Sequence, residues 1–174
     1  AGYQVPGDQL PVAEEVNARG FWESRQVVDF NERILSESGL SWFSLQMSNV
    51  DISDSLYSEM LEWLTLQIKL HQNLVIKDPR INILLPVWCR LLDELSVDLH
   101  IVFVNRYPDF VASSLEKRDG FSLHTGFALW LKYNWEALSA LNNRSATFVD
   151  FEELVSSVEE KKFLIESLGK QYIQ

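Results

Sequence analysis

The sequence predicts an α/β domain in which a parallel β-sheet is flanked by helices. Short apolar segments typical of strands alternate along the chain with longer segments whose apolar residues recur at helical spacing. Strands separated by helices pair in parallel, because each helix carries the chain back along the sheet. With 174 residues, of which 47% are hydrophobic, the chain suits one domain with a sizeable core. We therefore expect residues 1–174 to form a single domain.

The expected elements follow from this periodicity and from the residues that interrupt it. Helices are predicted over residues 23–38, 54–70, 82–95, 108–117, 122–142 and 151–168, strands over residues 74–76, 99–104 and 146–149, and irregular segments over residues 1–20 and 41–53. Gly39 is a natural stop for the first helix, and Pro86 is expected near the first turn of the third. The last helix is expected to break near Ser156 and Ser157.

Three segments also carry expectations about burial and capping. The strand over residues 99–104 is apolar except at His100, which is typical of a strand buried on both faces. The aromatic residues of segment 127–138 are expected in the core rather than on a sugar-binding surface. Asp150 and Glu152 follow the third strand and are expected to cap the helix after it.

Composition disfavours several classes of function. The net charge is −10 at pH 7, whereas proteins that bind duplex nucleic acid carry a basic face, so we expect no nucleic-acid partner. Cys89 is the only cysteine and lies in an apolar run, which predicts a buried, inert thiol and a reducing compartment. No run of about 18 apolar residues suggests a membrane span, and the three histidines lack the spacing of a zinc site. We expect a cytoplasmic chain that binds no metal.

A candidate phosphate site follows the second predicted strand. Arg106 comes just after the strand, Pro108 and Asp109 open a helix, and Ser113 and Ser114 lie one to two turns into it. A helix start offers free N–H groups and the positive end of a dipole, and an arginine can grip a phosphate with two parallel hydrogen bonds. The alternative is an ordinary helix cap beside a surface arginine.

A second group of charged residues, Lys77 and Asp78, follows the first predicted strand. Ligands of parallel sheets bind outside the carboxyl ends of the strands. Because Lys77 and Arg106 both occupy such ends, the sequence predicts that they contribute to one site.

Read in order, these segments resemble a bacterial sulfotransferase family that uses 3′-phosphoadenosine 5′-phosphosulfate. The matching segments are residues 20–23, 27–35, 41–42, 77–80, 106–109 with Ser114, 118–120, 129–134 and 149–154, within a span of residues 17–170. The resemblance implies a P-loop-like parallel sheet of the sulfotransferase type. It also implies the phosphosulfate as donor co-substrate, a glycan or small-metabolite hydroxyl as acceptor, and no metal.

The resemblance implies roles for individual residues. Arg106 and Ser114 would hold the 3′-phosphate, with Ser113 as the alternative hydroxyl. Lys77 would stabilise negative charge on the bridging oxygen during transfer. Asp78 is the candidate general base for the acceptor hydroxyl; alternatively it caps the turn before Arg80 and pairs with it.

Two further candidates concern the acceptor. Glu23 is expected to line the acceptor pocket, although an acid at a helix start needs no function. Better-known relatives carry Lys-Thr-His where this chain has Lys77, Asp78 and Pro79, so a histidine base is disfavoured. His124 would serve only if the loop around residue 120 folded over the site.

The family's first strand and its Ser/Gly/Thr-rich phosphate loop have no counterpart in this sequence. We therefore expect weak or no sulfuryl transfer by the 174-residue chain, and ordinary rates would contradict this. A sheet without that strand has an exposed edge, which favours a homodimer. Two alternatives remain open: a non-catalytic nucleotide-binding or interaction module of the same fold, and a small-molecule kinase, although no glycine-rich loop with a lysine is evident.

Overall fold

The computed structural model describes residues 2–11 and 22–170. The chain divides into two compact units, Gly2–Ser96 and the residues from Val97 onward, and each is described here by itself. Gly20 and Phe21 of the first matching segment, and residues 12–19 of the expected irregular start, lie outside the described residues. The fold is mixed α/β and mostly helical, with a two-stranded parallel sheet. The expectation of a single domain stays a prediction.

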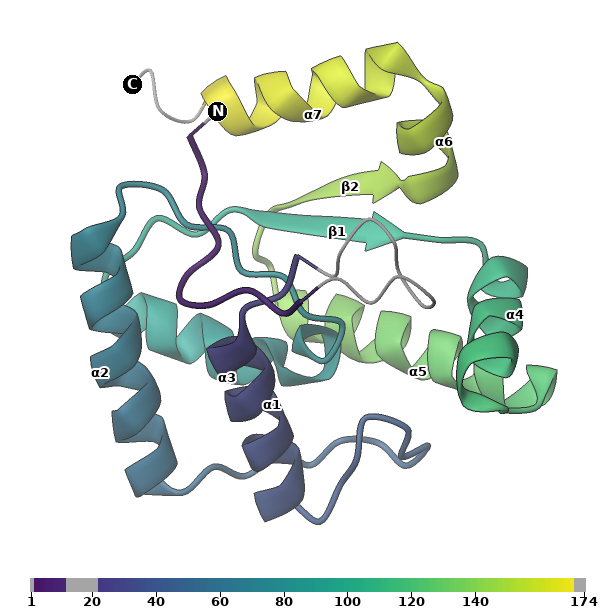
Figure 1. Cartoon of the computed structure of the whole chain (residues 1–174), viewed down its shortest axis with the longest axis horizontal. Coiled ribbons are helices and arrows are strands. Elements are labelled where there is room, and N and C mark those ends of the chain that lie inside the picture. Colours follow the sequence, from purple (N-terminus) through teal and green to yellow (C-terminus); the bar gives the residue numbers. More distant parts are fainter. Residues whose placement is uncertain (1, 12–21, 171–174) are drawn as a thin grey trace. The chain divides into compact units, whose positions relative to one another are not determined.

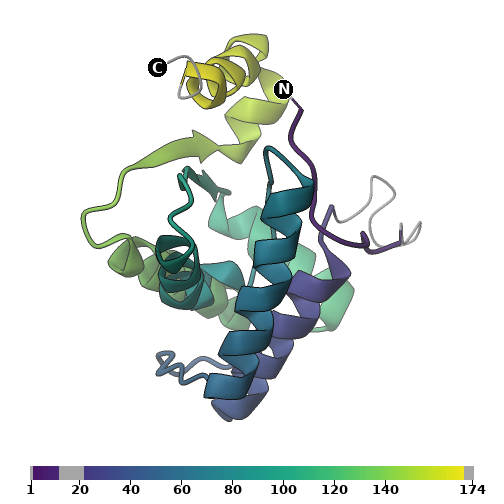
Figure 2. The same cartoon turned by 90° about the vertical axis from the view of Figure 1, so that its left-hand side faces the viewer.

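The described residues of the N-terminal unit form three helices: α1 (Arg25–Glu37), α2 (Asp54–Leu70) and α3 (Ile81–Glu94). All three lie within one or two residues of their predicted positions. Helices α1 and α2 run side by side (Figures 1 and 2). Their inward faces and one side of α3 supply the core, which is made of Val27, Phe30, Ile34, Leu35, Leu56, Met60, Leu64, Leu84, Trp88 and Leu91. Cys89 is buried, as predicted.

Side-chain caps explain where α1 and α2 begin. The hydroxyl of Ser24 accepts the Val27 N–H at 3.4 Å, and the hydroxyl of Ser53 accepts the Leu56 N–H at 3.3 Å. Gly39 follows α1 with a φ of +67°, a left-handed conformation that glycine adopts without strain. The segment between α1 and α2 contains no helix or strand, as expected.

The strand predicted at residues 74–76 does not form. Leu74 makes only an isolated parallel bridge with Gln4, through the Gln4 N–H to the Asn73 carbonyl at 3.0 Å and the Val75 N–H to the Gln4 carbonyl at 2.9 Å. The next bond of a parallel ladder would need an N–H two residues after Gln4, and that residue is Pro6, which has none. The ladder therefore ends after one bridge.

Pro86, expected near the first turn of α3, lies one residue further into the helix than the sequence predicts. Helix α3 begins at Ile81, so Pro86 is its sixth residue and lies inside the helix. A proline there cannot donate to the carbonyl four residues earlier. The apolar contacts of α3, whose Leu84 and Leu91 are fully buried, keep the helix continuous across this gap.

The C-terminal unit contains the sheet. Its elements are β1 (Ile101–Asn105), α4 (Pro108–Asp119), α5 (Leu123–Leu141), β2 (Ala146–Asp150), α6 (Phe151–Ser156) and α7 (Val158–Lys170). The strands pair in parallel, with Ile101 opposite Ala146 and Asn105 opposite Asp150 (Figure 1). The predicted break in the last helix is confirmed, because Ser157 separates α6 from α7. Among the described helices, none has the length and apolar character needed to cross a bilayer.

Burial in this unit differs from the expectation in two places. Strand β1 is not buried on both faces, since Val104 is 50% exposed. The aromatic residues of α5 are not in the core as expected: Phe127 is 37% and Trp135 is 61% exposed, and Trp130 is half-buried. His100 lies just before β1 and shares a hydrogen bond of 3.1 Å with the Thr147 hydroxyl, which satisfies the one polar residue of that apolar run. In the part of the chain that the structure describes, β1 and β2 pair only with each other.

Helices α4 and α5 pack closely because one residue at their contact has no side chain. A Cβ on Gly126 would lie 2.7 Å from the Cα and 2.8 Å from the Cβ of Ala112. Ordinary carbon contacts are about 3.5–4.0 Å. Gly126 and Ala112 thus set the distance between the two helices, and α4 is the helix that carries the candidate serines.

Candidate phosphate-binding site

The parallel sheet brings two helix starts to the same edge. Because Asn105 pairs with Asp150, Arg106 and Phe151 are the first residues beyond neighbouring strand ends. The arrowheads of β1 and β2 point the same way and lead into α4 and α6 (Figure 1). The residues that open α4 and α6 therefore lie close enough to interact.

Arg106 is held by contacts with the start of α6 and with α4 and α5. Its Nε donates to Glu152 Oε1 at 3.2 Å. Its guanidinium carbon lies 5.0 Å from the ring centre of Phe151 and 5.8 Å from that of Phe110, within the range of cation–π attraction. Its backbone carbonyl accepts the indole N–H of Trp130 at 2.8 Å. These contacts fix the side chain while leaving it 42% exposed.

Glu152 reaches across from α6 to α4. Its Oε2 accepts the Tyr107 N–H at 3.3 Å, just ahead of the first residue of α4. Of the two predicted helix caps, Asp150 is confirmed, since its Oδ1 accepts the Glu153 N–H at 3.0 Å. Glu152 was expected to cap the same helix and instead binds Arg106 and Tyr107, because the parallel register places those groups directly opposite it.

Helix α4 begins as the sequence predicts, with Pro108 in its first turn. Ser114 is exposed and Ser113 is half-buried. No hydrogen bond to either hydroxyl is found within the described ranges. Ser114 follows Phe110 by four residues and so shares the helix face against which the Arg106 guanidinium lies. Ser113 follows Phe110 by three residues and lies about 60° from it around the helix, so burial rather than angle distinguishes the two serines.

The second candidate group lies in the N-terminal unit. Lys77 Nζ bonds to Glu23 Oε1 at 2.5 Å, and the two side chains are 52% and 9% exposed. Glu23 directly precedes Ser24, the cap of α1, so its place follows from the start of that helix. The pair joins the two residues that the resemblance assigns to the sulfuryl group and the acceptor.

Asp78 forms the turn cap that was its alternative role. Its side chain is fully buried, and its Oδ1 accepts the Arg80 N–H at 2.8 Å and Nη1 at 3.1 Å. Arg80 also donates to Glu32 Oε1 at 2.6 Å. Burial lowers the pKa of Arg80, but the two carboxylates outweigh it and the pKa is raised above the ordinary value. The role of Asp78 as a base stays a prediction.

His124 lies in the first turn of α5 and is exposed. Its segment is helical from Leu123, so it does not belong to a closing loop. No group of three or more His, Cys, Asp or Glu side chains placed to hold a metal ion occurs among residues 2–11 and 22–170.

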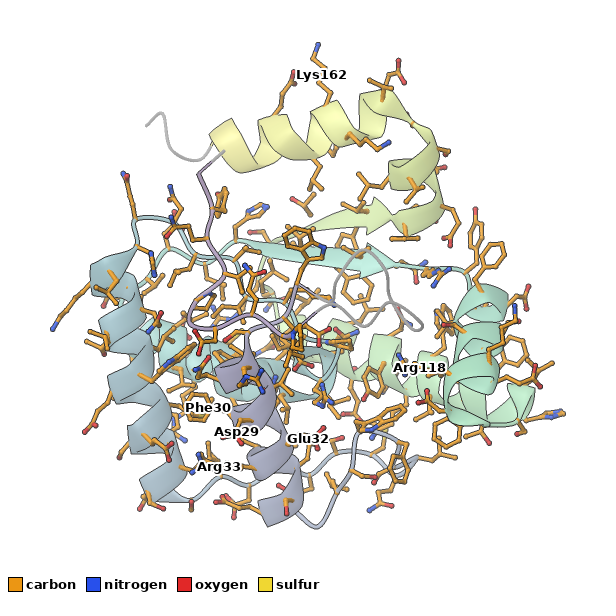
Figure 3. The ribbon with its side chains drawn as sticks, in the orientation of Figure 1. Asp29, Phe30, Glu32, Arg33, Arg118 and Lys162 are labelled. Atoms are coloured by element: carbon orange, nitrogen blue, oxygen red, sulfur yellow. The ribbon has the colours of Figure 1, made fainter. Side chains whose placement is uncertain are left out.

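A shallow cleft between α1 and α2 contains none of the predicted site residues. Asp29, Phe30 and Arg33 project from α1 (Figure 3), and Arg33 pairs with Glu59 of α2 through bonds of 2.8 and 2.6 Å. The cleft is lined by Arg25, Gln26, Asp29, Phe30, Glu59, Glu62 and Trp63. Arg33 and Glu59 are already bonded to each other, and we assign the cleft no binding role.

Sequence reasoning missed the groups that hold Arg106. Glu152, Phe110 and Phe151 were visible as residues near helix starts, but only the pairing of β1 with β2 places two of them beside Arg106. Comparison with known proteins adds no assignment, because no family model, no curated protein and no solved structure matches this chain.

Proposed function

We propose that the chain binds a 3′-phosphorylated adenine nucleotide at Arg106 and Ser114, and that this binding serves sulfuryl transfer from 3′-phosphoadenosine 5′-phosphosulfate to a hydroxyl. The observation that carries the proposal is the state of Arg106: it stands at the carboxyl end of β1, is held by Glu152, and remains 42% exposed. Arginine at that position suits a phosphate through its planar array of donors. The resemblance supplies the identity of the nucleotide.

Ser114 is the better hydroxyl for this proposal. It is exposed and shares a helix face with Phe110, whose ring lies beneath the Arg106 guanidinium. A phosphate between Arg106 and Ser114 would accept hydrogen bonds from the charged guanidinium and from the neutral hydroxyl. Ser113, which is half-buried, is less accessible.

In sulfuryl transfer the acceptor oxygen attacks sulfur while the bond from sulfur to the phosphate oxygen breaks. The nucleotide leaves as the 3′,5′-bisphosphate, and the acceptor proton passes to a base. Under this proposal Lys77 neutralises the leaving oxygen, and Glu23 holds Lys77 in place through their ion pair.

The state of Asp78 favours a second candidate, a module that binds the nucleotide without turning it over. A base must reach the acceptor proton, and the Asp78 carboxylate is fully buried and already bonded to Arg80. A sulfuryl-transfer assay with Lys77→Met as the comparison separates the two. Because only slow transfer is expected of the 174-residue chain, even a low rate that Lys77→Met abolishes supports the enzyme, whereas nucleotide binding with no detectable transfer supports the module.

The direct test is a titration with two nucleotides. Adenosine 3′,5′-bisphosphate should bind at least about tenfold more tightly than adenosine 5′-monophosphate, because the extra phosphate gains charge-assisted hydrogen bonds. Arg106→Ala should remove this preference. Arg118→Ala is a matched control, since Arg118 lies on α4 (Figure 3) and its side chain is also 42% exposed.

Three results would count against the proposal. Equal affinity of the wild-type chain for both nucleotides would remove the 3′-phosphate site. If Arg106→Ala keeps the preference for the bisphosphate, the site does not include Arg106. If Arg118→Ala removes the preference as completely as Arg106→Ala does, the effect is not specific to Arg106.

A further inference from the structure

We infer that Glu152 is the positioning residue of the phosphate site: its carboxylate holds the Nε side of Arg106 so that the Nη side faces the nucleotide phosphate. This inference rests on the proposed function of Arg106. It adds a residue that the sequence had assigned to helix capping.

The geometry divides the guanidinium into a bound side and an open side. The Nε donor is bonded to Glu152 Oε1 at 3.2 Å, and no other hydrogen bond to this guanidinium is found in the described part of the chain. Glu152 is the more covered partner, with its side chain 22% exposed against 42% for Arg106. The end that carries four Nη hydrogens therefore makes no hydrogen bond among the described residues, and it is the end that grips phosphate in pairs.

The same carboxylate also fixes the backbone beside the site. Its second oxygen accepts the Tyr107 N–H at 3.3 Å, so Glu152 ties the residue before α4 to the first turn of α6. One side chain thus sets both the direction of the arginine and the entry of the helix that carries Ser114. The rings of Phe110 and Phe151 limit the remaining rotation of the guanidinium.

Without Glu152, the Arg106 side chain would sample several rotamers in solvent. Binding of the phosphate would then restrict it to one of them. Ordering a long side chain costs conformational entropy, and a pre-oriented one avoids that cost. The charge of Glu152 acts in the opposite direction, because a carboxylate near a phosphate repels it. Since Glu152 lies on the Nε side and is mostly covered, we expect orientation to dominate.

The test measures the preference for adenosine 3′,5′-bisphosphate over adenosine 5′-monophosphate in five variants. Glu152→Ala should reduce the preference by about fivefold to tenfold. Glu152→Gln, which retains an acceptor oxygen for Nε, should restore part of it. The combined Arg106→Ala and Glu152→Ala variant should match Arg106→Ala alone, because Glu152 acts through Arg106. Glu153→Ala is the control, being the neighbouring exposed acid of α6.

A second readout does not require nucleotide. In an NMR spectrum that resolves arginine Nε–H groups, the Arg106 signal should be ordered in the wild-type chain and in Glu153→Ala, and should become mobile in Glu152→Ala. This measurement decides the positioning role even if the wild-type chain shows no 3′-phosphate preference, in which case the proposed function fails separately.

Three outcomes would overturn the inference while leaving the phosphate site standing. Tighter bisphosphate binding by Glu152→Ala would mean that the carboxylate competes with phosphate. An unchanged preference in Glu152→Ala would mean that Arg106 needs no support. Equal mobility of the Arg106 Nε–H in wild type and Glu152→Ala would show that the carboxylate does not fix it.

Discussion

The contact between α4 and α5 allows a sharp prediction about stability. Gly126→Ala adds one carbon atom at a place where it would lie 2.7 Å from the Cα of Ala112 and 2.8 Å from its Cβ. Neither atom can rotate away, because one is backbone and the other is bonded directly to it. The helices must therefore separate by about 1 Å to reach an ordinary contact distance.

Two effects of opposite sign set the magnitude. Replacing glycine by alanine within a helix ordinarily stabilises it by about 1 kcal/mol. Overpacking a close contact costs about 1–3 kcal/mol, and the upper end applies here because the obstacle is rigid. We expect Gly126→Ala to lower the free energy of unfolding by about 2 kcal/mol, the difference between the two.

Urea unfolding followed by far-ultraviolet circular dichroism measures this change as a lower midpoint with an unchanged slope. Ser139→Ala is the matched control, because Ser139 is exposed on the same helix and its replacement should leave stability the same or slightly higher. A Gly126→Ala protein as stable as the wild type would refute the argument, since it would mean that the two helices can separate without cost. The same variant should also weaken nucleotide binding, because α4 carries Ser114.

Three further substitutions test contacts of the N-terminal unit by the same unfolding experiment. Asn31→Ala should cost about 2 kcal/mol, because it leaves the buried indole N–H of Trp88, now bonded at 2.9 Å, without an acceptor; an unchanged midpoint would contradict this. Tyr57→Phe should cost about 1 kcal/mol at neutral pH through loss of the 2.8 Å bond to Glu94. Burial and then the bond to Glu94 raise the pKa of Tyr57. The contribution of Tyr57 to stability is therefore complete below pH 10 and is lost as the pH rises through the pKa of the folded state. Tyr57→Phe should accordingly lose less stability at alkaline pH than the wild type, and an equal loss in both would contradict the prediction. Asp78→Asn should cost about 1–2 kcal/mol by weakening a buried charged pair, and no change would show that the turn does not need it.

The helices were predictable because their signals are local. Serine caps and glycine stops lie within one turn of the ends they determine, as at Ser24 and Gly39, and the apolar residues of each helix repeat within the helix itself. The position of the Arg106 motif was predictable for the same reason. A strand end, an arginine and a proline-initiated helix are adjacent in sequence and remain adjacent in the fold.

The strand at residues 74–76 was mispredicted because pairing depends on a partner far away in the chain. The apolar character of the segment gave no information about its neighbour, and that neighbour contains Pro6, which ends the ladder after the single bridge at Gln4. The exposure of Trp135 and Leu131 had a similar origin. Helical spacing shows that apolar residues share a face, but it does not show whether another element covers that face.

The candidate site depends on strand register, which the sequence does not give. The sequence contained Arg106 and Glu152 and placed each at the end of a predicted strand, so each was correctly located within its own segment. Their contact depends on one further fact, the register in which Asn105 lies opposite Asp150. A shift by two residues would keep the same faces of both strands and would move Glu152 by about 6–7 Å along the sheet, beyond the reach of Arg106 and Tyr107. The assignment of Glu152 as a positioning residue is thus a consequence of strand register, and for that reason sequence reading alone could interpret it only as a helix cap.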